Sequence, residues 1–150
     1  MANGSLHELE ARWHAEIPIS ETMGIRVHRF DGETLETIAA LEPNLNVHGT
    51  AFAGSQFSAA ALCGWGQVYL QLGRAGLDGS IVFVEGTIRC VAPVREDMLV
   101  RCAWTATADE ALEALRQTGR ARVHLGVQIE SGGILAADFT GEYGVRRATD

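Results

Sequence analysis

The chain has 150 residues, 47% of them hydrophobic, and a formal net charge of -7 at pH 7. This length and apolar content suit one core, so we expect a single domain over residues 1–150. A nucleic-acid partner is not expected, because an acidic chain does not neutralise the phosphates of DNA or RNA. A membrane partner is not expected either, because no stretch has the pattern of a signal peptide or a membrane span.

An amphipathic helix and a strand hairpin are predicted in the first 41 residues. Apolar residues at helical spacing indicate a helix over about 6–16, which Pro18 ends. Strand character follows at 24–30 and 33–41, and the Asp31-Gly32 pair between them predicts a tight hairpin.

The segment 53–72 is a long apolar run that predicts a buried central helix. At about 1.5 Å per residue it would extend about 30 Å, enough to span a small domain. Gly64 and Gly66 each cost such a helix about 1 kcal/mol relative to alanine. We therefore expect the helix to pack closely against a sheet or another helix at these two glycines.

Strand periodicity dominates the second half of the chain. We expect strands over 81–90, 98–105, 122–129 and 135–143, and a short helix over 109–117. Asp109 is the predicted cap of the short helix, and Gly119 ends it. In the first of these strands, Val82, Val84 and Ile88 are predicted to share the buried face. One long helix against an antiparallel sheet is an α+β layer architecture.

The loop before the central helix, residues 44–55, is polar and rich in glycine. A loop that leads directly into a helix offers backbone N–H groups and the positive end of the helix dipole to a carbonyl oxygen. The N–H groups of Gly49 and Thr50 are therefore candidate oxyanion donors, although a helix cap with a turn glycine accounts for the same residues. No acidic residue lies between Glu42 and Asp78, so a catalytic carboxylate must come from elsewhere.

Four side chains in this region are candidates for positioning water or a carbonyl group, or for proton transfer. Asn46 and His48 alternate around Val47, so in an extended loop both would point the same way. Asn46 could then hold a water or a carbonyl, and His48 could act as a general base. Hydrogen bonding to nearby backbone is the alternative for both. Ser55 and Gln56, on the first helical turn, are candidates for positioning water or substrate.

Two charged residues outside the loop complete the set. Glu85 interrupts an apolar strand, on the face predicted to be opposite Val82 and Val84. An ion pair with Arg89 on a wet or intersubunit face is one interpretation, and a carboxylate donated across a dimer is the other. Arg95 is a candidate for binding phosphates at a pocket mouth, although exposed arginines are often only surface charge.

The cysteines and the basic residues exclude several kinds of site. Cys63, Cys90 and Cys102 are odd in number and have no C-x-x-C spacing, so we expect neither a disulfide framework nor a metal site. A reducing cytoplasm fits best. All twelve basic residues are arginine, which removes lysine chemistry of any kind.

The order of a strand pair, a loop, a long helix and a run of strands resembles the hotdog fold, in which a sheet wraps a central helix. Residues 46–52 and 88–100 look like the loop and the strand–proline–strand segment of hotdog thioesterases. Residues 49–55 (GTAFAGS) and 63–66 (CGWG) resemble most closely a bacterial thioesterase branch that occurs alone or fused behind a GNAT acetyltransferase domain. The similarity covers about 17–143.

This resemblance implies hydrolysis of an acyl thioester of coenzyme A or an acyl carrier protein, with no cofactor. It also implies sites at the interface of a homodimer or a dimer of dimers. Many hotdog thioesterases carry an acid on the first turns of the central helix, where this chain has 54–58 (GSQFS), and hotdog dehydratases also need a helix carboxylate. The missing acid leaves open a non-catalytic module that binds or senses acyl-CoA. The fused relatives indicate a third possibility, a structural partner of an acetyltransferase.

Overall fold

The structure is a computed structural model that describes residues 2–149, with side chains described from residue 6. Its helices are α1 (Ala2–Glu16), α2 (Pro18–Thr22), α3 (Ala53–Arg74) and α4 (Ala106–Thr118), with a 3-10 turn at Glu42–Asn44. Its strands are β1 (Arg26–Phe30), β2 (Thr34–Ala39), β3 (Gly79–Cys90), β4 (Met98–Ala103), β5 (Arg120–Ser131) and β6 (Ile134–Arg147). The predicted N-terminal helix, long central helix and sheet of about six strands are confirmed.

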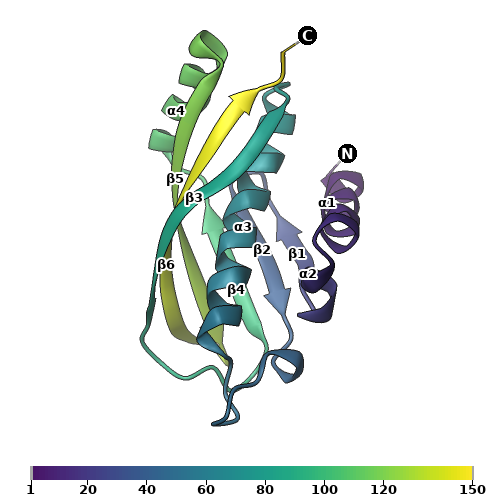
Figure 1. Cartoon of the computed structure of the whole chain (residues 1–150), viewed down its shortest axis with the longest axis vertical. Coiled ribbons are helices and arrows are strands. Elements are labelled where there is room, and N and C mark those ends of the chain that lie inside the picture. The colour runs from purple at the N-terminus through teal and green to yellow at the C-terminus, as the bar shows by residue number, and fades with distance from the viewer. Residues whose placement is uncertain (1, 150) are drawn as a thin grey trace.

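The sheet is antiparallel throughout and has the strand order β1-β2-β4-β5-β6-β3. It curves around α3, so that the helix lies against its concave face, and α1 lies beside α3 (Figure 1). This is the hotdog arrangement. β3 pairs with β6 on one side only and forms an edge of the sheet within the described chain.

The two helix glycines are explained by close neighbours from other elements. A Cβ atom on Gly64 would overlap the Tyr143 ring and hydroxyl, and one on Gly66 would lie 2.6 Å from the Trp13 ring. Tyr143 donates a hydrogen bond to the backbone carbonyl of Ala61 at 2.7 Å. The predicted close packing at Gly64 and Gly66 is therefore confirmed, with β6 and α1 as the packing partners.

The hairpin forms as predicted, but the start of α4 differs from the prediction. Asp31 Oδ1 accepts hydrogen bonds from the N–H groups of Glu33 and Thr34, which closes the turn between β1 and β2. α4 begins earlier, and Thr105 caps it by accepting from the N–H of Ala108 at 3.1 Å. The prediction of Asp109 as the cap is wrong, because its carboxylate instead accepts from Trp104 Nε1 at 2.7 Å.

The predicted buried face of β3 is wrong in its first half. The register with β6 shifts between Phe83 and Glu85, so Val84 is an extra residue that reverses the alternation of side chains. Val82 and Val84 are 60% and 42% exposed, whereas Phe83 packs edge-on against Phe57 with ring centroids 5.9 Å apart. A β-bulge of this kind depends on the partner strand and leaves no periodic signal in the sequence.

Candidate functional site

The loop between β2 and α3 is a closed turn held by Asn46. Its Oδ1 accepts from the N–H groups of His48 at 2.9 Å and Thr50 at 3.1 Å, and from the Thr50 hydroxyl at 3.2 Å. Its Nδ2 lies 3.0 Å from Thr50 Oγ1 and 3.4 Å from the carbonyl of Ala51. The loop is therefore a turn and not extended, and Asn46 makes the local hydrogen bonds to backbone that the alternative interpretation predicted.

The N–H groups of Gly49 and Thr50 are both used inside this turn. Gly49 N–H donates to the backbone carbonyl of Asn46 at 3.2 Å, and Thr50 N–H donates to the Asn46 side chain. Gly49 has a φ of +74°, a conformation that residues with a Cβ adopt at a cost. Gly49 and Thr50 thus shape the loop, and their N–H groups are occupied in this conformation.

The free N–H groups lie a few residues further on, at the start of α3. The N-cap residue is Phe52, which supplies no side-chain hydrogen bond to the helix. Among the described residues, no acceptor bonds the N–H groups of Ala53, Gly54 or Ser55. An uncapped helix start carries partial positive charge and three donors that point outward. It can therefore polarise a carbonyl oxygen placed beside it.

Gln56 connects this helix start to the loop and to β3. It is only 4% exposed, and its Nε2 donates to the carbonyl of Ala51 at 3.2 Å. Its Oε1 lies 3.9 Å from the thiol of Cys90, the last residue of β3. Ser55 is half-buried next to it on the first turn. Ser55 and Gln56 are therefore brought to the helix start, as predicted from their positions.

His48 and Arg95 both lie near this end of the molecule. His48 is exposed, and its ring has no hydrogen-bond partner among the described residues. Arg95 is exposed on the β3–β4 connection, next to Val94, whose backbone carbonyl accepts from Ala51 N–H at 3.0 Å. This hydrogen bond ties the connection that carries Arg95 to the loop that carries His48.

Glu85 is not brought to this cluster within one chain. It is exposed in the middle of β3, on the face that also carries Val82, whereas Cys90 at the end of the strand lies at the helix start. Within the described chain Glu85 has no ion-pair partner, so the predicted pair with Arg89 is absent. Glu85 therefore faces away from α3 and its helix start in this chain.

The three thiols differ in their surroundings. Cys63 and Cys102 are fully buried, and loss of solvation raises the pKa of the Cys63 thiol to about 12 and that of Cys102 well above its usual value. Both are inert core residues, as predicted for Cys63. Cys90 is exposed and lies near Gln56, a position that sequence reasoning missed because only the fold brings the end of β3 to α3.

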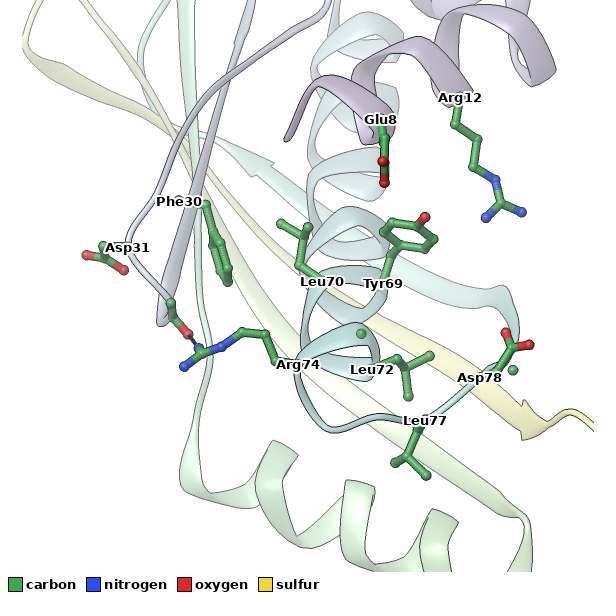
Figure 2. Close-up of a pocket in the computed structure, with 13 residues that line it drawn as sticks. Glu8, Arg12, Phe30, Asp31, Tyr69, Leu70, Leu72, Arg74, Leu77 and Asp78 are labelled. Atoms are coloured by element: carbon green, nitrogen blue, oxygen red, sulfur yellow. Dashed lines mark hydrogen bonds between the residues drawn. The ribbon is translucent and has the colours of Figure 1, made fainter. Parts of the chain in front are cut away.

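A cavity of about 720 Å³ lies at the opposite end of α3. Its walls come from α1, the β1–β2 hairpin, the last turns of α3 and the start of β3 (Figure 2). None of the predicted site residues lines it. The sequence analysis missed this cavity because its walls are separated by up to about 70 positions along the chain and become neighbours only in the fold.

The described residues were also compared with the requirements of a metal site and of a membrane-spanning helix. No cluster of three or more histidine, cysteine, aspartate or glutamate side chains in the described residues could hold a metal ion. Within the same part of the chain, every helix is too short or too polar to cross a membrane.

Comparison with known proteins identifies relatives over almost the whole chain. The family model described as "Putative thioesterase (yiiD_Cterm)" matches residues 6–147. The putative thioesterase from Shewanella oneidensis, known from a crystal structure, is 39% identical, with a TM-score of 0.89, and the match covers 95% of this chain and 97% of that chain.

Two other solved structures are similar. A protein of unknown function from Chlorobaculum tepidum is 27% identical, with a TM-score of 0.92, and the match covers 98% of this chain and 97% of that one. A Pseudomonas aeruginosa protein described as a probable thioesterase is 19% identical, with a TM-score of 0.81 and 95% coverage of both chains. The last similarity shows the shared fold alone.

Proposed function

This chain belongs to the putative thioesterase family, and from that membership we propose that it hydrolyses an acyl thioester of coenzyme A or of an acyl carrier protein. Family and fold support thioester hydrolysis in general.

The observation that carries the proposal is the uncapped start of α3. The thioester carbonyl oxygen would accept hydrogen bonds from the free N–H groups of Ala53, Gly54 and Ser55, where negative charge develops as water attacks. Gln56 and the Ser55 hydroxyl would position the water or the acyl group. Gly49, Thr50 and Asn46 would hold the loop in the shape that leaves this helix start open.

The proposal places His48 as the general base, with Glu85 of a second copy as the alternative. An imidazole without a hydrogen-bond partner is free to take a proton from water. A second copy would pair along β3, because this edge strand has 12 residues, no covering element on its outer side within the described chain, and exposed Val82 and Val84. A homodimer, or a dimer of such dimers, would result.

Arg95 completes the proposed site as a contact for the phosphates of coenzyme A. It is exposed on the connection that Val94 joins to the loop, so a guanidinium group would stand at the mouth of the site. The reaction as proposed uses no cofactor, and the protein would work in the cytoplasm, where its free cysteines stay reduced.

Release of free thiol from a panel of thioesters tests the proposal. The panel contains acetyl-, octanoyl-, palmitoyl- and benzoyl-CoA and an acyl carrier protein thioester. We expect turnover with at least one member. Tight binding of an acyl-CoA without thiol release would instead support a binding or sensing module, and silence with every substrate together with no binding would contradict the proposal.

Matched variants separate the two proposed bases. His48→Gln should lower kcat by about 10²- to 10⁴-fold if the imidazole is the base, whereas Glu85→Gln should do so if the carboxylate acts across the dimer. Glu110→Gln, at an exposed carboxylate of α4, is the control that removes one negative charge elsewhere. Sedimentation of each variant shows whether an activity loss follows from loss of the dimer.

A further inference from the structure

Phe52 differs from the other aromatic residues in its exposure. It is 55% exposed, whereas every other aromatic residue of the described chain is buried or half-buried. Its backbone is fixed, because its N–H donates to the carbonyl of Asn44 at 2.7 Å and its carbonyl accepts from the N–H of Gln56 at 3.1 Å. A fixed backbone therefore holds an exposed phenyl ring at the start of α3.

Gly54 provides the seat for this ring. A Cβ atom on Gly54 would lie 2.4 Å from Cε2 and 2.8 Å from Cζ of Phe52, and its three nearest atoms all belong to that ring. Gly54 is not among the glycines with positive φ, so its backbone does not require glycine, and glycine is less favourable than alanine in a helix. A single exposed apolar side chain is common on protein surfaces, but a ring that excludes a side chain from the first turn of a helix is a specific arrangement.

This arrangement places the ring beside the free donors of the helix start. Phe52 is the N-cap of α3, and the N–H groups of Ala53, Gly54 and Ser55 have no acceptor among the described residues. The ring lies over Gly54, the middle residue of the three. A carbonyl group bound by these N–H groups therefore lies next to the ring, and one of its two substituents contacts it.

Gln56 is a second, independent sign that this place receives a ligand. The residue is 4% exposed, and its Nε2 is used by the carbonyl of Ala51 at 3.2 Å. Among the described residues, the donor nearest to its Oε1 is the thiol of Cys90 at 3.9 Å, and thiols are weak donors. A buried amide oxygen without a strong donor favours a site that is filled from solution, by water or by a polar group of a ligand.

The chemistry of a thioester decides which substituent of the carbonyl meets the ring. A phenyl ring is apolar, so it suits the acyl carbons, which need no hydrogen bonds. The arm of coenzyme A or of a carrier protein, on the sulfur side, carries amide groups that lose hydrogen bonds to water against an apolar surface. The acyl side is therefore the favoured neighbour of Phe52.

We propose, building on the proposed thioester hydrolysis, that Phe52 is a specificity-determining residue for the acyl group. Its ring, seated on Gly54, packs against the acyl carbons that follow the carbonyl and selects thioesters whose acyl chain is apolar and longer than acetyl. The ring takes no part in the chemical step, so its effect is on the choice of substrate.

Calorimetric titration with two stable analogues measures this choice without turnover. S-acetonyl-CoA carries a methyl group beside a carbonyl, and S-(2-oxohexyl)-CoA carries a butyl group beside the same carbonyl. We expect the protein to bind the butyl probe about tenfold more tightly. Phe52→Ala should reduce this preference at least about threefold with little change for the methyl probe, and Phe52→Leu, which keeps an apolar side chain, should retain most of it. The ratio of kcat/KM for pentanoyl-CoA to that for acetyl-CoA should fall by the same factor.

The glycine provides a second test, in which the ring itself is kept. Gly54→Ala should displace the ring and reduce the preference as far as Phe52→Ala does, and it should have no further effect in the Phe52→Ala background. Gly73→Ala is the matched control in the same helix, since a Cβ atom there would meet no atom within 4 Å, and it should leave the preference unchanged. Thermal unfolding shows that each variant is folded.

The outcomes separate this role of Phe52 from the proposed hydrolysis. An unchanged preference in folded Phe52→Ala, or an equal loss for both probes, would overturn the acyl contact, and turnover of thioesters would still support hydrolysis. A preference that depends on Phe52 in a protein that releases no thiol would support the acyl contact and overturn hydrolysis. Failure of the parent protein to bind either probe would overturn the acyl contact.

Discussion

Replacing Ala53 with proline tests whether the helix start polarises the substrate. Ala53 is the first residue of α3, and Phe52 before it has φ and ψ of -61° and 133°, a conformation that a residue preceding proline adopts readily. Proline is favoured at the first helical position because the N–H group it lacks has no partner within the helix. The substitution therefore removes one free donor and leaves the other atoms of the site in place.

The two consequences differ in size and direction. Loss of one oxyanion donor costs about 2.7–4 kcal/mol of transition-state stabilisation, which lowers kcat by about 10²- to 10³-fold. Stability should rise by about 0.4–1 kcal/mol, because proline restricts the unfolded chain, and Tm should rise by about 1–4 °C. Steady-state kinetics on the best thioester substrate and thermal unfolding followed by circular dichroism measure both quantities.

Ala106→Pro is the matched control, since Ala106 is the exposed first residue of α4, after an extended Thr105. It should give the same small gain in Tm and leave kcat unchanged. If kcat of folded Ala53→Pro stays within about twofold of the parent protein, the start of α3 does not polarise the carbonyl and the reasoning is refuted. An equal loss of kcat in both variants would also refute it.

Three other predictions follow from the same contacts. Asn46→Ala should lower Tm by about 4–8 °C, because about 2 kcal/mol of loop hydrogen bonds is lost, whereas Asn46→Asp should keep most of it. A fall in kcat of Asn46→Ala at unchanged Tm would show that Asn46 contacts substrate or water instead. Iodoacetamide should label Cys90 alone in the folded protein, because burial raises the pKa of the Cys63 and Cys102 thiols. In urea it should label all three cysteines, and mass spectrometry counts the labels in both cases. The N–H groups of the hairpin lower the pKa of Asp31, so its stabilising contribution should be complete above the ordinary aspartate pKa and disappear as pH falls through the folded-state value. Carboxyl chemical shifts of Asp31 in an NMR pH titration report this pKa, and an ordinary value would contradict the assigned hydrogen bonds.

The fold was largely predictable because its signals are local. Alternation of apolar residues placed the strands of the β5–β6 hairpin, and the apolar run before Arg74 placed α3 to within two residues. Gly64 and Gly66 indicated close packing before any partner was known, since glycine inside a helix is costly unless a neighbour requires the space. The predicted position of Gly119 at the end of α4 agrees with its φ of +80°.

The sequence predicted which segment carries the candidate site but not which of its N–H groups are free. The sequence pointed to the loop before α3 and to Ser55 and Gln56, which do lie at the helix start. It assigned the N–H donors to Gly49 and Thr50, whose N–H groups instead close the turn with Asn46. Residue type and spacing do not show which of several equivalent donors is already bonded.

By itself, then, the sequence determined the order of the elements, the central helix and the segment that carries the proposed site, because these depend on periodicity within about 20 residues. Only the tertiary structure decided the bulge at Val84, the meeting of Cys90 with Gln56, and the cavity that α1 shares with the hairpin and the end of α3. Each of these depends on contacts between segments far apart in the chain, and such contacts form only when the sheet curves around the helix.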